Sequence, residues 1–327
     1  MGARGGEVGL HRGQGAGRNP AQAMRSRAAP ALALVLLLAT AGANGVWADS
    51  SNEFWLLYEQ GNAAASQREF GQAMRLYKEA VVGAGIFPEA EAAIGDVYLE
   101  EGEATLAQRQ YEKAYDERKS LYIPEQQYDI LHKLANLFEM QQSYKLMEDR
   151  LSQIVADDKR FQDTATQHMR TQVERNFLDK GLDRVLVLYD FTDQSFAAPA
   201  HSKLGWFYYR TGRFSPAVSN LLYSVIFRAS EMRQVLKDRD VDYEFSNAAE
   251  LLGSIEDNPE LKAYAQSTGF YKDIYYLAGS MFANGYPQHA RTLWTLLTSA
   301  PSAGQYRDLS VRQLKKPFVE PLLSLTR

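Results

Sequence analysis

The chain of 327 residues contains no cysteine. It can therefore form neither disulfide bonds nor cysteine-based zinc sites, and it lacks the thiol to which a bacterial lipoprotein anchor is attached. An exported chain without disulfides is more typical of a bacterial periplasm or cell surface than of a eukaryotic secretory route. Such a chain is stabilised by burial of apolar surface alone, which a mature length of roughly 280 residues allows.

Residues suited to catalysis or metal binding are also scarce. Neither Gly253-Ser254 nor Gly279-Ser280 has the flanking residues of a nucleophile elbow, and Gly83-Ala84-Gly85 does not continue into a phosphate-binding loop. The histidines that follow residue 48 are not at metal-ligand spacing; they are His132, His168, His201 and His289. We therefore expect a non-enzymatic protein with no catalytic residues, no metal and no cofactor.

Residues 1–48 have the pattern of a presequence that ends in a secretory signal peptide. A basic start at Arg25 is followed by an apolar run at residues 31–39, and small residues predict cleavage after Ala48. Met24 is an alternative start of the chain, because the residues before it are rich in glycine and arginine.

An uncleaved membrane anchor is the alternative for this segment, since residues 28–48 are almost uncharged and close to membrane-spanning length. Gly42 and Gly45 favour cleavage, so we expect a periplasmic or exported protein with no stable membrane anchor. Removal of the presequence leaves 31 basic and 39 acidic residues, a net charge of −8. This balance argues against nucleic acid and anionic membrane surfaces as partners.

Helical periodicity of apolar residues runs almost throughout residues 49–327, and strand-like alternation never persists for more than a few residues. No linker rich in Gly, Ser or Pro divides this region, so we expect a single all-α domain. The pattern is interrupted at residues 230–269, where we expect a charged connection and two short helices. An amphipathic segment at residues 308–325, interrupted by Pro317 and Pro321, is expected to cap the C-terminal end.

Small and aromatic residues recur at an interval of 34 residues. The matched pairs are Gly61 and Gly95, Ala73 and Ala107, Tyr77 and Tyr111, and Ala80 and Ala114. A 34-residue period predicts helix–turn–helix units that stack into a solenoid. We expect the glycines to lie where two helices approach closely, the alanines to pack on the second helix, and the tyrosines to fill the gap between the helices.

These two units resemble tetratricopeptide repeats. A third close match begins at Leu204-Gly205 and includes Ala217, and a degenerate unit surrounds Ala135. Two further segments fit loosely, Leu182–Tyr189 and Ala278–Trp294, and the last is one residue short. The resemblance covers most of the chain after residue 52 and implies a right-handed solenoid of about six units, three specific and three degenerate.

In tetratricopeptide repeats the first helix of each unit lines a concave groove, so the resemblance also implies a partner-binding surface. Transfer of the groove positions gives the candidates Tyr58, Asn62, Asp96, Asn136, Trp206, Tyr209 and Arg210, together with Ala65, Ser66, Ala92, Leu99, Glu100, His132, Glu139, Met140 and Ser202.

Trp206, Tyr209 and Arg210 are expected on one helix face, because residues three and four apart are neighbours, and their types are enriched at binding hot spots. The alternative is that Trp206 and Tyr209 pack against an adjacent helix or the inserted segment. Chaperone-binding repeats hold a carboxylate with basic residues, whereas Tyr58 and Asp129 occupy two of those positions here. A chaperone-tail adaptor is therefore disfavoured.

The sequence favours an exported α-solenoid that binds a protein or peptide of the cell envelope. A second interpretation is a small-ligand-binding component associated with a solute-uptake system, with aromatic residues near Trp206 and Tyr209 lining a pocket. A closed aromatic cavity would favour the ligand, and an open groove of mixed polarity would favour the peptide.

Overall fold

The computed structural model describes residues 51–162, 164–192, 195–320 and 322–323. These residues are mostly helical and contain no strand, so the all-α prediction is confirmed. The predicted presequence lies outside the described residues.

The helices occupy most of the described chain. Their bounds are α2 (Ser51–Ser66), α3 (Phe70–Ala84), α4 (Pro88–Glu100), α5 (Ala104–Asp116), α6 (Gln126–Met140), α7 (Tyr144–Asp157), α8 (Lys159–Gln162), α9 (Thr164–Leu188), α10 (Ala198–Arg210), α11 (Phe214–Arg239), α12 (Ala248–Glu256), α13 (Pro259–Thr268), α14 (Phe270–Ala283), α15 (Pro287–Thr298) and α16 (Gln305–Lys315), with short 3-10 turns η2 (Arg118–Ser120), η3 (Ser195–Ala197) and η4 (Pro301–Ala303).

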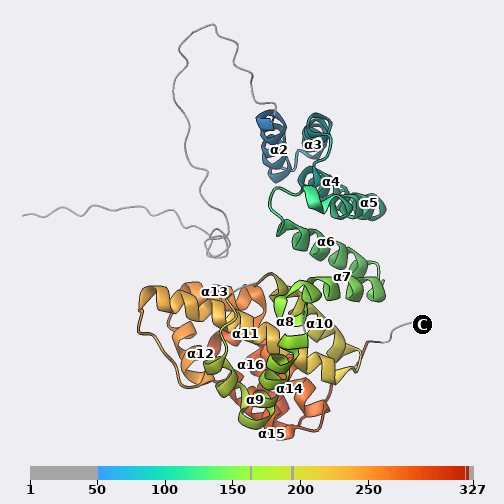
Figure 1. Ribbon diagram of the computed structural model, residues 1–327. Coiled ribbons are helices and arrows are strands. Elements are labelled where there is room, and N and C mark those ends of the chain that lie inside the picture. Colours follow the sequence, from blue (N-terminus) through green and yellow to red (C-terminus); the bar gives the residue numbers. More distant parts are fainter. Residues whose placement is uncertain (1–50, 163, 193–194, 321, 324–327) are drawn as a thin grey trace, which may run out of the picture.

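Helix pairs stack in chain order, as in a solenoid. The pairs α2/α3, α4/α5, α6/α7 and α10/α11 each pack internally, and α3 packs on α4, α5 on α6, and α7 on α10. The first three pairs form a narrow arm in Figure 1, and the elements from α8 to the C-terminus form a thicker body. The pair α14/α15 follows, with α14 packed on both α10 and α11.

The repeat glycines lie where two helices of one unit touch. A Cβ atom on Gly61 would lie 2.5 Å from the ring of Tyr77, and one on Gly95 would lie 2.5 Å from the ring of Tyr111. At Gly205 the same added atom would meet Leu221, again at 2.5 Å. These distances are too short for carbon atoms, so only glycine fits at the three positions without a shift.

The alanines of the period are fully buried. Ala73, Ala80, Ala107, Ala114 and Ala217 are all 0% exposed. Each therefore occupies a helix contact that has no room for a larger side chain, as the sequence period predicts.

The solenoid is interrupted between α7 and α10. The loosely matching segment Leu182–Tyr189 does not form a unit of the stack, because α7 packs directly on α10. It is the second half of α9, which is kinked at Gly181 (φ 78°) and whose Leu182, Val185 and Leu186 join the core of the C-terminal body. Within the described residues the stack thus contains five helix pairs instead of about six.

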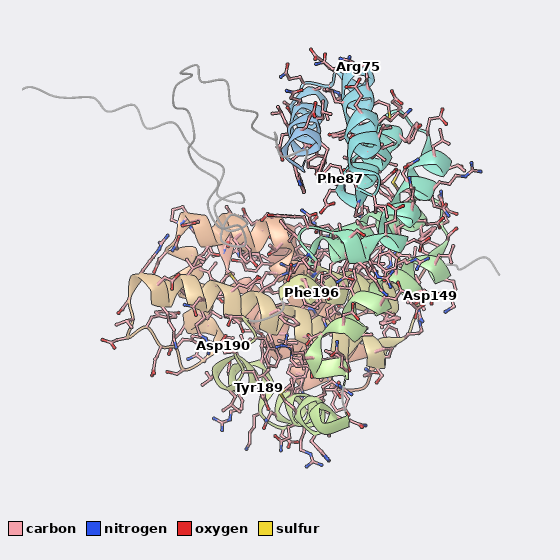
Figure 2. The ribbon with its side chains drawn as sticks, turned by 45° about the horizontal axis from the view of Figure 1, so that its top comes forward. Arg75, Phe87, Asp149, Tyr189, Asp190 and Phe196 are labelled. Atoms are coloured by element: carbon pink, nitrogen blue, oxygen red, sulfur yellow. The ribbon has the colours of Figure 1, made fainter. Side chains whose placement is uncertain are left out.

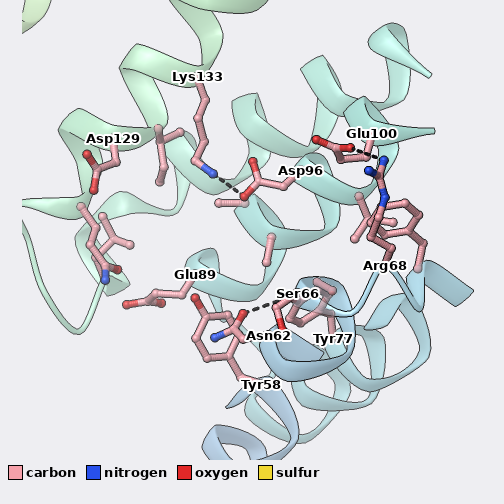
Figure 3. Close-up of a pocket in the computed structure, with 18 residues that line it drawn as sticks. Tyr58, Asn62, Ser66, Arg68, Tyr77, Glu89, Asp96, Glu100, Asp129 and Lys133 are labelled. Atoms are coloured by element: carbon pink, nitrogen blue, oxygen red, sulfur yellow. Dashed lines mark hydrogen bonds and ion pairs between the residues drawn. The ribbon is translucent and has the colours of Figure 1, made fainter. Parts of the chain in front are cut away.

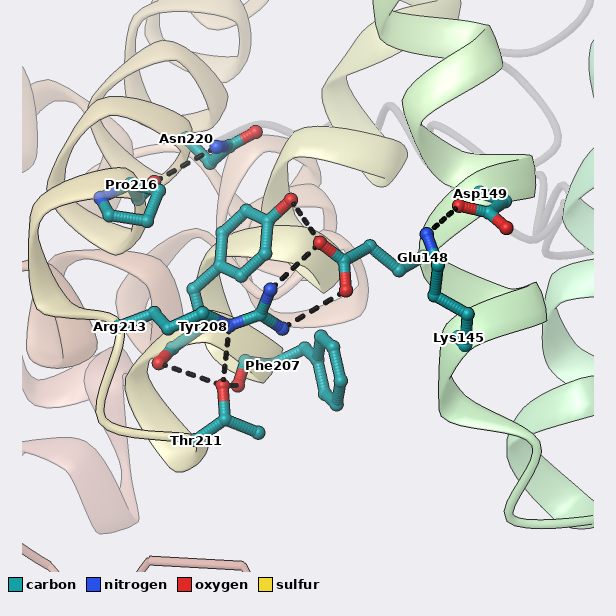
Figure 4. Close-up of polar contacts among 9 residues, drawn as sticks. All are labelled: Lys145, Glu148, Asp149, Phe207, Tyr208, Thr211, Arg213, Pro216 and Asn220. Atoms are coloured by element: carbon teal, nitrogen blue, oxygen red, sulfur yellow. Dashed lines mark hydrogen bonds and ion pairs between the residues drawn. The ribbon is translucent and has the colours of Figure 1, made fainter. Parts of the chain in front are cut away.

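A bidentate ion pair holds the two sides of this interruption together. The guanidinium of Arg213, at the start of α11, donates to both carboxylate oxygens of Glu148 on α7, at 2.8 and 3.1 Å. The hydroxyl of Tyr208 on α10 donates to the same carboxylate at 3.1 Å (Figure 4). Parallel hydrogen bonds of this kind fix orientation as well as distance, so α7 and α10 keep one register.

The inserted region differs in part from the prediction. The two short helices are present as α12 and α13, but α11 does not end near Ala229; it continues to Arg239. The extension follows from burial, because every residue from Leu221 to Ser230 is buried and Met232 is 0% exposed. The charged connection is therefore shorter than expected and begins at Asp240.

The C-terminal segment covers the last helix pair, as the amphipathic pattern predicts. Helix α16 packs on α14 and α15. Beyond it, the carboxylate of Glu320 accepts a hydrogen bond from the hydroxyl of Tyr275 at 2.9 Å, and the Glu320 N–H donates to the hydroxyl of Tyr209 at 3.0 Å. The described end of the chain thereby shields the face of α14 that no further unit covers.

Candidate functional site

A groove runs along the first helices of the first three units. It has a volume of about 660 Å³ and is lined mainly by α2, α4 and α6 (Figure 3). The first two units contribute seven of the eight positions transferred from the repeat pattern, namely Tyr58, Asn62, Ala65, Ser66, Ala92, Asp96 and Glu100. The transferred positions of the first two units thus converge on a single groove.

The third unit lines the groove with residues other than those expected. Gln126, Asp129, Ile130 and Lys133 line the groove from α6, whereas the transferred positions His132, Asn136, Glu139 and Met140 do not. Asn136 and Glu139 instead contact Lys203 on α10, so this part of α6 faces the next unit.

Equivalent hydrogen bonds tie the groove to the repeat tyrosines. The hydroxyl of Tyr77 donates to Asn62 Oδ1 at 2.9 Å, and the hydroxyl of Tyr111 donates to Asp96 Oδ1 at 2.8 Å. Burial, reinforced by the nearby carboxylates, raises the pKa of Tyr77 to about 12 and the pKa of Tyr111 further. Both phenols therefore remain donors at physiological pH, and each fixes the first polar groove residue of its unit.

Both cations that line the groove are paired with acids of the same groove. Lys133 Nζ contacts Asp96 Oδ2, and the guanidinium of Arg68 lies 3.4 Å from the carboxylate of Glu100. The other two acids of the lining are Glu89 and Asp129, and among the described residues no cation forms an ion pair with either. The groove is therefore acidic.

Aromatic rings cluster beside Glu89. Phe87, which precedes α4 (Figure 2), makes an edge-to-face contact with Trp55 at 4.8 Å between ring centroids, and its ring lies 5.3 Å from that of Tyr58. Tyr122 reaches Trp55 from the loop before α6, at 5.4 Å, and remains largely exposed. Of these rings Tyr58 lines the groove, so one end of the groove combines an aromatic ring with the carboxylate of Glu89.

The second predicted surface, on α10, is mostly covered. Tyr209 is 1% exposed, and its ring lies 3.0 Å from the Cβ position of Gly279 on α14. The expectation that Tyr209 faces a groove is therefore wrong, because α14 packs across this face. Trp206 is half-buried, with the charged groups of Arg210 and Lys272 at 5.8 and 5.6 Å from its ring. Ser202, another transferred position, is also buried.

Tyr209→Phe tests the buried role of that residue. The change removes the hydroxyl that accepts the N–H of Glu320, while the ring keeps its packing against α14. We expect the free energy of unfolding to fall by about 1 kcal/mol, measured by urea denaturation. Tyr286→Phe, on an exposed ring, is the control and should unfold like the parent. Equal midpoints for both variants would contradict this placement of Tyr209.

Sequence reasoning missed a basic position that joins consecutive units. Lys133 and Lys203 both lie two residues before the repeat position held by Ala135 and Gly205. Each reaches back to the preceding first helix: Lys133 contacts Asp96, and Lys203 lies 2.5 Å from both Asn136 Oδ1 and the Glu139 carboxylate. Asn136 therefore bridges two units, and the shared offset is the signal that could have identified this position.

A smaller cavity of about 320 Å³ lies between α7, α8, α10 and α11. His201 lines it and is 1% exposed; its Nδ1 lies 2.9 Å from Asn220 Oδ1. Asn220 donates its own amide to Pro216, so its oxygen accepts the Nδ1 hydrogen, and His201 Nε2 is left as a buried acceptor without a partner. The hydroxyl of Tyr223, in the same lining, also has none among the described residues.

Burial of His201 predicts a loss of stability in mild acid. Burial lowers the pKa of His201 to about 4, from an ordinary value of about 6.5 in the unfolded chain. Between the pKa of the unfolded chain, about 6.5, and that of the folded chain, about 4, only the unfolded chain binds a proton at His201. The free energy of unfolding therefore falls as the pH drops through this range. Relative to His201→Gln, the parent should lose about 2 kcal/mol between pH 7 and pH 5 in urea titrations. A constant difference would contradict a buried neutral imidazole.

No described helix has the length and apolar character needed to cross a bilayer. The same part of the chain contains no group of three or more His, Asp or Glu residues arranged to hold a metal ion.

Comparison with known proteins gives distant relatives. An uncharacterized protein of Treponema pallidum is 24% identical over 226 residues, which cover 67% of this chain and 59% of the relative. An uncharacterized protein of Borreliella burgdorferi is 24% identical over 298 residues, which cover 81% of this chain and 92% of the relative. The matched region thus spans little more than half of the Treponema protein. No family model matches the chain.

Proposed function

We propose that this protein is a non-enzymatic, exported scaffold of the tetratricopeptide-repeat type, which binds a protein or peptide of the cell envelope in the groove of its first three units. One observation carries the proposal: seven of the eight positions that the 34-residue repeat gives for the first two units line a single groove of about 660 Å³. The export component rests on the sequence pattern of residues 1–48.

The composition of the groove favours a peptide over a small apolar solute. Its lining contains carboxylates, two amides and two cations among small, aliphatic and aromatic side chains. A peptide backbone and its side chains can use such separated polar groups, whereas an apolar solute would leave them desolvated. The distant relatives in two bacteria are uncharacterized and say nothing of its location or partner.

The experiment is groove-dependent capture from an envelope extract of the native host. Ser66 is exposed and lines the groove, so Ser66→Tyr should obstruct the groove without entering the core. Ala63, exposed on the same helix but outside the lining, provides the matched control Ala63→Tyr. We expect a protein that binds the parent and Ala63→Tyr but not Ser66→Tyr. Equal capture by all three would rule out this groove as the binding surface.

A small-ligand-binding role associated with solute uptake is the second candidate. It is favoured by the cavity that contains the unpartnered His201 Nε2 and Tyr223 hydroxyl, because buried polar atoms without partners are uncommon in native proteins. Its ligand would be small and would donate a hydrogen bond to Nε2. A thermal-shift screen of polar solutes tests it, and stabilisation that is lost in His201→Phe is the expected result.

A further inference from the structure

Two buried glutamates lie in the first turn of α4, and only one of them has a cation. Glu91 is 3% exposed and pairs with Lys113. Glu89 is 5% exposed; its Oε1 accepts the N–H of Tyr122 at 2.7 Å, while its Oε2 is buried and has no hydrogen-bond partner among the residues that the structure describes. The positive end of the helix dipole favours negative charge at this position. A carboxylate oxygen there is an acceptor that lacks a donor.

Glu89 belongs to the groove. Figure 3 shows its carboxylate and that of Asp129 on the side of the cavity away from the Arg68–Glu100 pair. Four acids and two cations line the cavity, and the cations are engaged by Asp96 and Glu100. The charge left for an occupant is therefore negative and is concentrated where Glu89 and Asp129 lie.

The ring of Tyr58 restricts the kind of cation that fits. It lines the groove beside Glu89 (Figure 3), and Trp55 packs against it at 5.6 Å between ring centroids. A guanidinium can stack on an aromatic face while its N–H groups donate to carboxylates in its plane, which an ammonium does less well.

We propose that the peptide bound in this groove places a basic side chain, preferably arginine, against Glu89 and Asp129. The inference rests on the peptide-binding function proposed above and adds the chemical class of the anchor residue. Lys133 and Arg68 do not compete for this place, because each is held by another acid.

Peptide selection on the purified protein tests the inference. Random peptides displayed on phage are selected in parallel on the parent, on Glu89→Gln and on the control Glu101→Gln, whose exposed side chain lies outside the lining. We expect a fixed basic residue among peptides selected on the parent and on Glu101→Gln, and no such residue on Glu89→Gln. A selected peptide is then synthesised with its arginine replaced by the neutral isostere citrulline. This replacement should weaken binding to the parent about tenfold, and binding to Glu89→Gln by less than about threefold.

The outcomes separate the two proposals. One outcome is that the selected peptides lose binding to Ser66→Tyr, which shows that they need an open groove, and yet carry no preferred basic residue. That result would overturn the proposed arginine anchor and leave the peptide-binding function standing. Selection of no groove-dependent peptide would overturn both. Glu89→Gln keeps an oxygen for the Tyr122 N–H, and its melt is compared with that of the parent. Asp129→Asn, on an exposed residue, should also weaken binding of the arginine peptide without any effect on folding.

Discussion

Gly95→Leu should lower the free energy of unfolding by about 3 kcal/mol or more. Even the first side-chain carbon would lie 2.5 Å from the ring of Tyr111, which is 0% exposed. That ring cannot move aside at low cost, because its hydroxyl is hydrogen-bonded to Asp96. The two helices of the unit must separate instead, and the change is measured by chemical denaturation followed by circular dichroism.

Two matched variants show whether steric contact is the cause. Gly253 lies inside α12 with open space around its Cβ position, so Gly253→Leu should be neutral or slightly stabilising, since glycine is a poor helix former. Ala107→Leu, at a position 0% exposed on the second helix of the same unit as Gly95, should be destabilising like Gly95→Leu. If Gly95→Leu unfolded at the same midpoint as Gly253→Leu, the repeat packing described for this unit would be wrong.

Asp273→Ala should cost about 3–5 kcal/mol of stability. Asp273 is 0% exposed on α14, and its two oxygens accept hydrogen bonds from the hydroxyls of Ser202 at 2.7 Å and Ser224 at 2.6 Å. Burial raises the pKa of this carboxyl, while the guanidinium of Arg228, 6% exposed on α11, acts in the opposite direction. Removal of the carboxylate leaves the Ser202 hydroxyl without this acceptor and the Ser224 hydroxyl with only the Ala198 carbonyl, at 3.3 Å. It also removes one of the two negative charges that stabilise the buried Arg228 cation, the other being Glu231.

The double variant Asp273→Ala with Arg228→Met separates the charge effect from the cavity. Removal of both charges should recover part of the lost stability, because the buried cation that lost one of its counter-charges is then gone. Asp242→Ala, at an exposed loop position, should unfold like the parent. Thermal melts of the four proteins at equal concentration are sufficient. A double variant no more stable than Asp273→Ala would show that the cation contributes little to the loss.

Contacts inside one repeat unit were predictable because they are local. Gly61 meets Tyr77, Gly95 meets Tyr111 and Gly205 meets Leu221, each 16 residues along the chain. The two helices of a unit have the same geometry in every unit, so residues at a constant separation along the chain meet in the same way. The residue types at these positions therefore recur with the period. The same regularity located the groove helices and most of the groove residues of the first two units.

The sequence by itself determined the helical class, the period and the face of α2 and α4 that lines the groove. Tertiary structure alone decided that α14 covers Tyr209, that α9 leaves the stack, and that Glu89 lacks the cation that Glu91 has. These features depend on segments such as α10 and α14, which are separated by most of the inserted region. No period links residues so far apart; packing of their apolar faces brings them together, and a hydropathy pattern marks a face as apolar without saying which partner covers it.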